Sequence, residues 1–287
     1  LGGLGWVAGG VTRAMGALRR FKPEAVIGFG GYAGFCPVLA AWLMGTPTAV
    51  HEQNSRPGVT NKVLGKLVKK VFLSFADDTD AFPKAKTVLT GNPVRETIFA
   101  ARETTRDHGR NLLVLGGSQG AKPLNDAVVA ALPALMKAGV TLLHQAGKNE
   151  EERVREAYRE AGADPDCVKG FIEDMNAAYR RADLVLARAG ASTVFELAAA
   201  GKPSVLVPFP QATHDHQTAN ARALERAGGT LVVPQPELLD GWIESNTESM
   251  FDAATLSAMA GKAAAFARPD AARDIVNGLE AMTSGRG

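Results

Sequence analysis

Short apolar runs rich in β-branched residues alternate with segments of helical periodicity along this chain, in two successive series. Such alternation is typical of βαβ units, in which a helix joins neighbouring parallel strands. The first series predicts strands at 25–29, 48–51, 71–75 and 87–89, and helices at 12–21, 33–43 and 59–69. The second series predicts strands at 111–115, 141–144, 168–170, 183–187, 204–207 and 230–233. The pattern therefore predicts an α/β protein with two mostly parallel sheets.

A polar stretch without strand character separates the two series. The turn-forming residues 91–95 and the polar residues 102–110 precede a fresh strand, which indicates a domain boundary near 95–108. We assign residues 1–98 to an N-terminal domain and residues 99–287 to a C-terminal domain. The last helix is expected to pack back on the N-terminal domain. A length of 287 residues with 46% hydrophobic content suits two domains of ordinary size.

The two halves of the chain carry opposite net charge. Residues 1–100 contain 12 Lys and Arg against 6 Asp and Glu, which leaves 20 against 24 for residues 101–287. The halves are therefore expected to meet different partners. The acidic second half and the aromatic content of 6% disfavour a nucleic-acid-binding module.

Cysteine content and hydropathy exclude further classes. Cys36 and Cys167 lie far apart in the sequence and fit neither a disulfide framework nor a thiolate metal motif, so a reducing compartment is expected. No apolar run reaches the roughly 18 residues that a membrane-spanning helix needs. We therefore expect no spanning segment.

Each series contains a glycine-rich turn between a strand and a helix, at 28–34 and at 116–122. Neither turn fits the dinucleotide fingerprint G-x-G-x-x-G, and neither closes with the G-K-[ST] of a phosphate-binding loop. Either turn alone could be a tight connection and no more. Two such turns in twin α/β halves favour facing domains with a ligand cleft between them.

A third turn, at 187–196, carries the most specific chemistry. A buried strand ends there, and Gly190, Ala191 and Ser192 let a ligand approach the backbone where a helix begins. The first N–H groups of that helix and its dipole attract a diphosphate. Glu196 could accept hydrogen bonds from two neighbouring ribose hydroxyls. The alternative is a capped strand-to-helix connection with a solvent-facing Glu196, and the turn alone leaves both readings open.

Eight ordered motifs then point to one family. They lie at 28–32, 51–54, 91–95, 116–119, 171–175, 191–196, 208–210 and 216–220. In these motifs the chain closely resembles the UDP-N-acetylglucosamine:N-acetylmuramyl-(pentapeptide) pyrophosphoryl-undecaprenol N-acetylglucosaminyltransferases, the MurG family. It departs from the family pattern at its start, where a strand and a glycine-rich loop containing a His are expected. About two βα units of N-terminal sequence are therefore expected to be missing.

The resemblance implies two Rossmann-like domains facing across a cleft, the GT-B glycosyltransferase fold, with the donor bound mainly in the C-terminal half. It implies an inverting hexosyltransferase that moves N-acetylglucosamine from UDP-N-acetylglucosamine to the 4-hydroxyl of the muramyl sugar of lipid I. The product would be lipid II, the peptidoglycan precursor. The alternatives are a catalytically impaired UDP-sugar-binding fragment, a GT-B enzyme that acts on another lipid acceptor, and a UDP-sugar epimerase.

The resemblance also assigns the donor site. Ile172 would read the uracil edge with its backbone, and Glu196 would hold the ribose hydroxyls. Gln217 and Asn220, three residues apart on a helix, would direct amides at sugar hydroxyls, and Arg95 would meet sugar or phosphate oxygens. Surface amides and a hinge ion pair are the simpler alternatives. The remaining donor-site residues lie in the second and third turns: Ser118, Gln119, Ala191, Ser192, Thr193, Val194 and Phe195.

The acceptor side is less defined. His51 lies at the C-terminal end of a strand that faces the expected cleft, where a neutral imidazole could accept a proton as catalytic base. A structural histidine is the alternative, and the His of the missing loop is an equal candidate. Tyr32 could orient the acceptor, and Asn54 could help to hold it or the diphosphate.

We expect transfer without a tightly bound metal. The nearest acidic cluster, Asp77, Asp78 and Asp80, is better interpreted as a solvated loop than as a metal–diphosphate site. His214 and His216 diverge on a helix and have no evident third ligand for zinc.

The region 59–72 suggests contact with an anionic membrane surface. Lys62, Lys66 and Lys70 form a stripe at helical spacing, with Lys69 beside it and Val63, Leu64, Leu67 and Val68 on the adjacent face. Arg13, Arg19, Arg20 and Lys22 add positive charge to the same domain. A solvated lysine face on a core-packed helix explains the stripe equally well. A lipid-linked acceptor favours peripheral attachment at the cytoplasmic face of the inner membrane.

Overall fold

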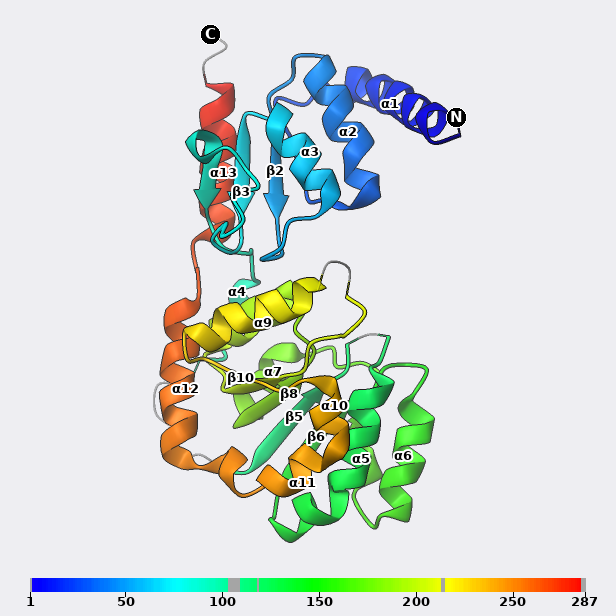
Figure 1. The fold of residues 1–287 in the computed structure, drawn as a ribbon, viewed down its shortest axis with the longest axis vertical. Helices are drawn as coiled ribbons and strands as arrows, with labels where there is room; N and C mark the ends of the chain where they lie inside the picture. Colours follow the sequence, from blue (N-terminus) through cyan, green and yellow to red (C-terminus); the bar gives the residue numbers. More distant parts are fainter. Residues whose placement is uncertain (1, 103–108, 118, 213–214, 285–287) are drawn as a thin grey trace. The chain divides into compact units, whose positions relative to one another are not determined.

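The computed structural model of the chain describes residues 2–102, 109–117, 119–212 and 215–284 (Figure 1). The chain forms two compact units: unit 1 comprises residues 1–93 and 270–287, and unit 2 comprises residues 94–269. The division falls between residues 93 and 94 rather than between 98 and 99, and the last helix belongs to unit 1.

Unit 1 contains a four-stranded parallel sheet whose strands lie in sequence order. Helices connect its first three strands, because parallel neighbours need a crossover. All four strands expected in this half are confirmed. In chain order the elements are β1 (Val26–Gly28), α2 (Gly31–Leu43), β2 (Thr48–Glu52), α3 (Val59–Leu67), β3 (Lys70–Leu73), η1 (Lys84–Lys86) and β4 (Thr87–Leu89).

The first helix is longer than the sequence pattern predicts. The expected helix spans 12–21, whereas α1 spans Gly2–Phe21. Each glycine inside a helix costs about 1 kcal/mol relative to alanine, which makes this segment look unfavourable. Packing offers a reason for glycine here, because a Cβ on Gly10 would lie 2.7 Å from Sγ of Cys36 on α2. The glycine thus allows α1 and α2 to approach closely.

The core of unit 1 lies on both faces of its sheet. Val50 and Val71 pack against Val38 of α2 and Leu64 of α3 on one face. On the other face, the last helix, α13 (Ala271–Thr283), brings Ile275 and Met282 against Ala49 and Phe72. A Cβ on Gly278 would lie 2.6 Å from the Phe72 ring, so α13 packs tightly at that point.

The lysine stripe expected at 62, 66 and 70 is wrong at its last position. α3 ends at Leu67, and Lys70 is the first residue of β3. The helix stops because pairing with β2 begins: the Lys69 N–H donates to the Thr48 carbonyl at 2.9 Å. Only Lys62 and Lys66 of the stripe remain on the helix.

Unit 2 contains a six-stranded parallel sheet in the order β10-β9-β8-β5-β6-β7. The chain builds outwards from β5 to β7 and then returns to place β8 on the other side of β5. The strand order therefore reverses between β5 and β8, and the carboxyl ends of the strands at such a point are where open α/β sheets bind ligands. All six expected strands are confirmed: β5 (Asn111–Leu115), β6 (Thr141–Gln145), β7 (Val168–Lys169), β8 (Leu184–Ala187), β9 (Ser204–Leu206) and β10 (Leu231–Val232).

Helices connect these strands and continue towards the C-terminus. They are α4 (Glu96–Phe99), α5 (Lys122–Lys137), α6 (Glu151–Glu160), η2 (Pro165–Cys167), α7 (Met175–Arg181), α8 (Ala191–Ala200), α9 (His216–Arg226), α10 (Gln235–Glu237), η4 (Leu238–Trp242), α11 (Ile243–Asn246), η5 (Ser249–Phe251) and α12 (Ala253–Phe266).

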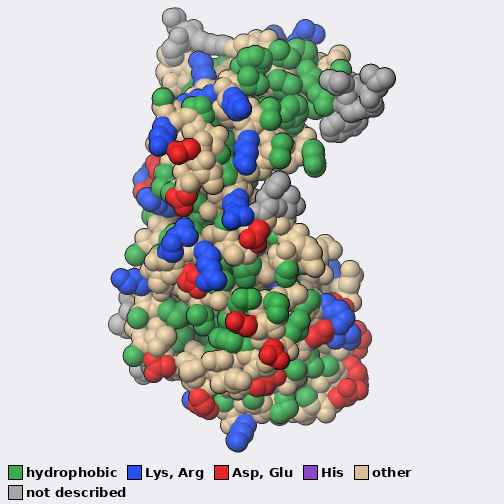
Figure 2. Space-filling view, in the orientation of Figure 1, with side chains coloured by type: hydrophobic (Ala, Val, Ile, Leu, Met, Phe, Trp, Pro, Cys, Tyr) green, Lys and Arg blue, Asp and Glu red, His purple; other side chains and the backbone are tan. Residues whose placement is uncertain are grey.

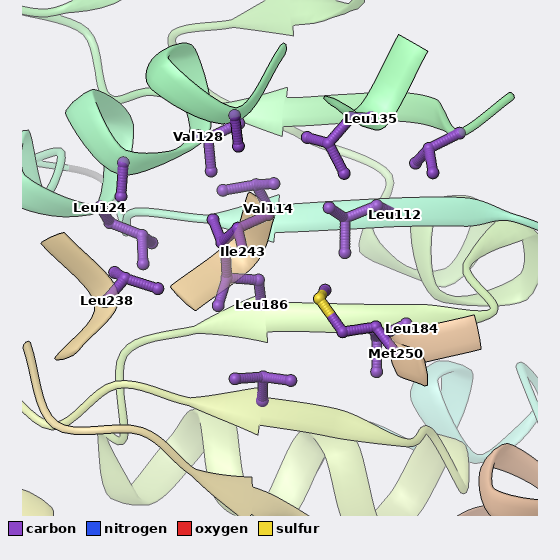
Figure 3. Close-up of a cluster of buried hydrophobic side chains, with 14 of the residues drawn as sticks. Leu112, Val114, Leu124, Val128, Leu135, Leu184, Leu186, Leu238, Ile243 and Met250 are labelled. Atoms are coloured by element: carbon purple, nitrogen blue, oxygen red, sulfur yellow. The ribbon is translucent and has the colours of Figure 1, made fainter. Parts of the chain in front are cut away.

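The central strands of unit 2 are buried on both faces. Leu112 and Val114 of β5 pack, with Leu184 and Leu186 of β8, against side chains of α5 and of residues 238–250 (Figure 3). Leu113, the intervening residue of β5, is 1% exposed on the opposite face. Burial on both sides explains why these strands are continuously apolar instead of alternating. The rigid sheet positions the turns at its carboxyl edge.

Across the described ranges, no helix has the length and apolar character needed to cross a bilayer.

Candidate functional site

The carboxyl edge of the unit 2 sheet carries three small-residue turns next to the point where the strand order reverses. They follow β5, β6 and β8, and their described residues are 116–117 with 119–120, 146–147 and 188–190. The sequence pattern identified the first and the third. The turn after β6 was missed, although Gly147 directly after a strand was a signal that could have found it.

The turn after β8 ends in an uncapped helix N-terminus. Gly190 is the N-cap of α8, with φ −62° and ψ 146°, and it offers no side-chain cap. The first N–H bonded inside the helix is that of Val194, which donates to Gly190 at 3.0 Å. The amides of residues 191–193 therefore precede the helical ladder, where backbone donors and the dipole attract an anion.

The side chains around this N-terminus differ in their exposure. Ser192 is exposed, Thr193 is half-buried, and Ala191 is 8% exposed. Val194 and Phe195 are buried at 0% and 2% exposure. A ligand at this N-terminus would thus meet Ser192 and Thr193, whereas Val194 and Phe195, which were expected as donor-site residues, are buried out of its reach.

Glu196 is fixed in place by two neighbours. The phenol of Tyr179 donates to Oε2 of Glu196 at 3.1 Å, and Nη2 of Arg95 lies 3.7 Å from Oε1. Burial, together with the negative charge of Glu196, raises the pKa of Tyr179 well above its usual value, so the phenol stays protonated and donates. A half-buried carboxylate has lone pairs left for further hydroxyl donors. Tyr179 was not identified from the sequence.

Arg95 contacts a cavity as well as Glu196. The cavity has a volume of about 400 Å³ and lies between α4 and the start of α7. Its polar lining includes Glu173, Asp174, Asn176 and Arg180. The side chain of Arg95 is 64% exposed, so its guanidinium is accessible to a ligand while it lies beside Glu196. The ion-pair alternative and the ligand-binding hypothesis are therefore compatible.

The loop after β5 is built from glycines in the left-handed region. Gly117 and Gly120 both have φ +79°. Among the described residues, and apart from the chain neighbours of Gly117, no atom lies within 4 Å of the position that a Gly117 Cβ would occupy. A Cβ on Gly120 would instead lie 2.5 Å from the Ala146 carbonyl. Gln119 is exposed, and Ser118 lies outside the described residues.

Ile172 has a buried side chain, and its amide is already engaged. Its N–H donates to Oε1 of Gln145 at 3.1 Å, and its side chain is 8% exposed. Within the described residues its carbonyl accepts no hydrogen bond. In this state the carbonyl is the group that can meet a base edge directly, and Gln145 is a further residue that sequence reasoning missed.

The two amides on α9 face inward more than the spacing suggested. Oε1 of Gln217 accepts from the Phe209 N–H at 3.0 Å. Asn220 is 0% exposed, and its Nδ2 donates to the Ala189 carbonyl at 3.3 Å. Residues three apart do share a face, but here that face covers the turn after β9, through Gln217, and the turn after β8, through Asn220. Asn220 therefore stabilises the turn after β8 from its buried side.

Arg188 ties the turns after β8 and β9 together. Its guanidinium donates to the carbonyls of Val207 and Pro208 at 3.2 and 3.3 Å and to Oε1 of Gln235 at 2.7 Å. It also lies over the Phe209 ring, 5.6 Å from the centroid. Partial burial lowers its pKa. A cation at the end of an apolar strand was the sequence signal for this role.

In unit 1, His51 is buried instead of facing solvent. Its side chain is 0% exposed; Nε2 donates to the Gly91 carbonyl at 3.1 Å and Nδ1 accepts from Gln53 at 3.2 Å. Burial lowers the pKa of the imidazole despite the opposing effects of Gly91 and Glu52. Because both ring nitrogens are engaged, this geometry favours a positioning role over direct proton abstraction.

Glu52 organises the loop that follows β2. Its buried carboxylate accepts from the backbone N–H groups of Asn54 and Gly58 and from Nδ2 of Asn61, at 3.0, 3.1 and 2.8 Å. Asn54 is half-buried in this loop. Tyr32, on the first turn of α2, is 83% exposed and thus accessible to a ligand.

The acidic loop has its own internal hydrogen bonds. Oδ1 of Asp77 accepts from the Thr79 N–H at 3.1 Å and Oδ2 from the Phe82 N–H at 3.1 Å. Among the described residues no three or more His, Cys, Asp or Glu side chains cluster as metal ligands would. His214, the partner considered for His216, lies outside the described residues.

Comparison with known proteins identifies the family to which the chain is similar. The profile of the glycosyltransferase family 28 C-terminal domain matches residues 111–275, and that of the family 28 N-terminal domain matches residues 6–73. The chain is 52% identical over 285 residues to a UDP-N-acetylglucosamine–N-acetylmuramyl-(pentapeptide) pyrophosphoryl-undecaprenol N-acetylglucosamine transferase of Nitratidesulfovibrio vulgaris. That alignment covers 95% of this chain and 76% of the relative.

Solved structures give the same result. The crystal structure of Acinetobacter baumannii MurG is similar with a TM-score of 0.79 and 35% identity, over 94% of this chain and 77% of that one. A UDP-GlcNAc 2-epimerase from Neisseria meningitidis, bound to UDP-GlcNAc, is similar with a TM-score of 0.66 but only 15% identity, over 96% and 80%. The second likeness is one of fold alone.

Proposed function

This chain belongs to glycosyltransferase family 28, and from that membership we propose that it transfers N-acetylglucosamine from UDP-N-acetylglucosamine to the muramyl 4-hydroxyl of lipid I, forming lipid II. It is a hexosyltransferase of peptidoglycan synthesis, and its two parallel-sheet units are those of the GT-B fold. The close relative from N. vulgaris is named for this transfer.

One observation carries the donor side of the proposal: Glu196 is held by Tyr179 one turn after an uncapped helix N-terminus. A fixed carboxylate accepts from two adjacent ribose hydroxyls, while the amides of residues 191–193 donate to the diphosphate. The distance of one helical turn, about 5 Å, suits the separation between a ribose and its phosphates.

The same groups serve the chemistry. When the acceptor hydroxyl attacks the anomeric carbon, the bond to the diphosphate breaks and negative charge develops on the leaving UDP. Oriented amides stabilise that charge where it develops, without having to reorganise. The cationic Arg188 behind the turn adds a fixed positive charge to the same region. Transfer is therefore proposed to proceed without a tightly bound metal.

Unit 1 is proposed to carry the acceptor and to rest on an anionic membrane surface. On α3, Val59 and Val63 are 62% and 45% exposed, and the exposed Lys62 and Lys66 lie beside them. Figure 2 shows hydrophobic side chains gathered over the part of unit 1 that contains α2 and α3. Apolar residues flanked by lysines suit a headgroup interface, and each lysine near anionic lipid contributes about 1 kcal/mol. The cytoplasmic face of the inner membrane is the proposed location.

A transfer assay tests the proposal. The full chain is incubated with UDP-[¹⁴C]N-acetylglucosamine and lipid I, and label is measured in the lipid phase. Label should enter lipid with the wild-type chain and much less with Glu196→Gln. Binding of UDP without any transfer to lipid I would contradict the proposed activity and favour a nucleotide-sugar-binding protein.

A further inference from the structure

A buried polar network lies beneath the glycine loop of unit 2. Its centre is His144 of β6, which is 0% exposed. Nδ1 of His144 lies 2.9 Å from the Tyr158 hydroxyl on α6, and Nε2 lies 3.0 Å from Oδ1 of Asn125 on α5. Nδ2 of Asn125 lies 3.0 Å from the Ala146 carbonyl. We call Tyr158, His144 and Asn125 the β6 network.

The hydrogen bonds of the β6 network can run in one direction only. The Ala146 carbonyl can only accept, so the amide nitrogen of Asn125 faces it and Oδ1 faces His144. The Nε2 atom must then carry the imidazole proton, and Nδ1 must accept from the Tyr158 hydroxyl. Each hydrogen bond thus fixes the direction of the next one, from the Tyr158 hydroxyl to the Ala146 carbonyl. The arrangement needs a neutral imidazole, and burial lowers the pKa of His144 to about 3, with the positive charge of Arg153 acting in the same direction.

The network ends on the segment that supports the glycine loop. Ala146 and Gly147 form the turn after β6, and the Gly147 backbone, at φ +91°, lies against Gly120 so closely that a Cβ on Gly147 would overlap it. The Gly116 N–H donates to the Gln145 carbonyl at 3.0 Å. Gly116 and Gly120 of the loop after β5 therefore rest on residues 145–147, and Asn125 holds that segment through the Ala146 carbonyl.

The same segment also reaches the proposed base-binding residue. Oε1 of Gln145 accepts from the Ile172 N–H, and the Ala146 N–H donates to the Lys169 carbonyl at 2.9 Å. Residues 145 and 146 thus connect the loop after β5 to the strand that leads to Ile172.

We propose that the β6 network positions the donor-binding loops, so that Tyr158 and His144, which touch no ligand, set the affinity for the nucleoside diphosphate through Asn125 and Ala146. This inference rests on the proposed function. It adds Tyr158 and His144, two buried residues, to the groups that determine UDP affinity. Their effect on UDP affinity can be measured separately from their effect on the stability of the fold.

The test removes one hydroxyl and keeps the ring. Tyr158→Phe leaves the buried aromatic side chain in the core but takes away the donor to Nδ1 of His144. The matched control is Val154→Ala, one turn earlier on α6, where Val154 is 0% exposed and lies in the same core cluster. Both variants remove buried groups of α6, but only the first alters the network.

Three measurements are made on the full chain: the unfolding midpoint, the affinity for UDP by calorimetry, and the tautomer of His144 from the ¹⁵N shifts of its ring. The wild-type ring should show the Nε2–H tautomer. Tyr158→Phe should mix the two tautomers and weaken UDP binding about five- to tenfold, the effect of about one buried hydrogen bond. Val154→Ala should lower the midpoint and leave UDP affinity unchanged.

The contrary outcomes are distinct. UDP affinity unchanged in Tyr158→Phe, or weakened equally in Val154→Ala, would overturn the inference while the proposed function stands. Failure of the wild-type chain to bind UDP would overturn the proposed function, and the inference with it.

Discussion

The phenol of Tyr179 donates a 3.1 Å hydrogen bond to Oε2 of Glu196, the carboxylate that also lies 3.7 Å from the Arg95 guanidinium. Tyr179 is wholly buried, so it cannot contact a ligand itself. Its effect on the donor must pass through the orientation of Glu196.

Two substitutions separate contact from orientation. Glu196→Ala should weaken UDP binding by about 1.5–3 kcal/mol, because it removes a charged acceptor. Tyr179→Phe should weaken it by about 1 kcal/mol, because the carboxylate remains but is no longer fixed. Titration calorimetry measures both, and Glu152→Gln on the exposed face of α6 serves as the control. Unchanged affinity in Glu196→Ala would remove this residue from the site.

The glycine loop offers a matched pair of alanine substitutions. Gly117→Ala meets open space but forces φ +79° on a side-chain-bearing residue, at a cost of about 1–2 kcal/mol. Gly120→Ala has the same φ and would also press against the Ala146 carbonyl, so it should destabilise unit 2 more. Chemical denaturation gives this order. We expect Gly117→Ala to remain folded but to bind UDP more weakly, and full affinity in that variant would make the loop purely structural.

His144 should make unit 2 less stable in acid. Its pKa is about 3 when folded, against about 6.5 when unfolded, so between these values only the unfolded state binds the proton. Its stabilising contribution is complete above pH 6.5 and is lost as the pH falls towards 3, by about 2 kcal/mol at pH 5. Amide exchange at Val114 in β5, a strand of unit 2, measures this loss of stability. The loss of stability between pH 7 and pH 5 should be smaller in His144→Gln than in the wild-type chain. An equal loss of stability in both proteins would show that another group titrates.

Removal of divalent cations tests whether backbone amides stabilise the leaving diphosphate without a metal ion. In excess EDTA the transfer rate should stay within about twofold of its value with Mg²⁺, since backbone donors and the helix dipole neutralise the leaving group. The radiolabel assay measures this directly. If EDTA strongly lowered the transfer rate and added Mg²⁺ restored it, a bound cation would be shown to neutralise the diphosphate.

Charge reversal on α3 tests the membrane surface. The double substitution Lys62→Glu with Lys66→Glu should weaken sedimentation with anionic vesicles by tenfold or more, because each lysine contributes about 1 kcal/mol. The matched control is Lys137→Glu with Lys148→Glu, two exposed lysines of unit 2. Equal binding of the wild-type chain to neutral and anionic vesicles would count against electrostatic attachment.

The strands and the turns could be predicted from the sequence because their signals are local. Residues 112–115 are apolar without interruption, and Gly116 follows directly after this run. Burial on both faces of a parallel sheet produces that pattern wherever it occurs. The fold class and the position of the turn that is proposed to bind the diphosphate were predicted from signals of this kind.

The directions of side chains could not be predicted in the same way. Asn220 and His51 were expected to face a ligand, and both are 0% exposed. Tyr179 contacts Glu196 across 17 positions of sequence, and His144 contacts Asn125 across 19. Such contacts depend on how helices pack on the sheet, which no local period encodes. α1 extends to Gly2 for the same reason, since tertiary packing overrides helix propensity there.

The return of α13 to unit 1 has a practical consequence for dissecting the enzyme. Unit 2 is one continuous segment, residues 94–269, whereas unit 1 is assembled from both ends of the chain. Unit 2, which is proposed to bind the nucleotide, can therefore be excised with two cuts at its borders. Truncation of the C-terminus at residue 269 would instead remove α13 and expose Phe72 and Ala49. It would therefore destabilise unit 1, although most of that unit lies at the other end of the sequence.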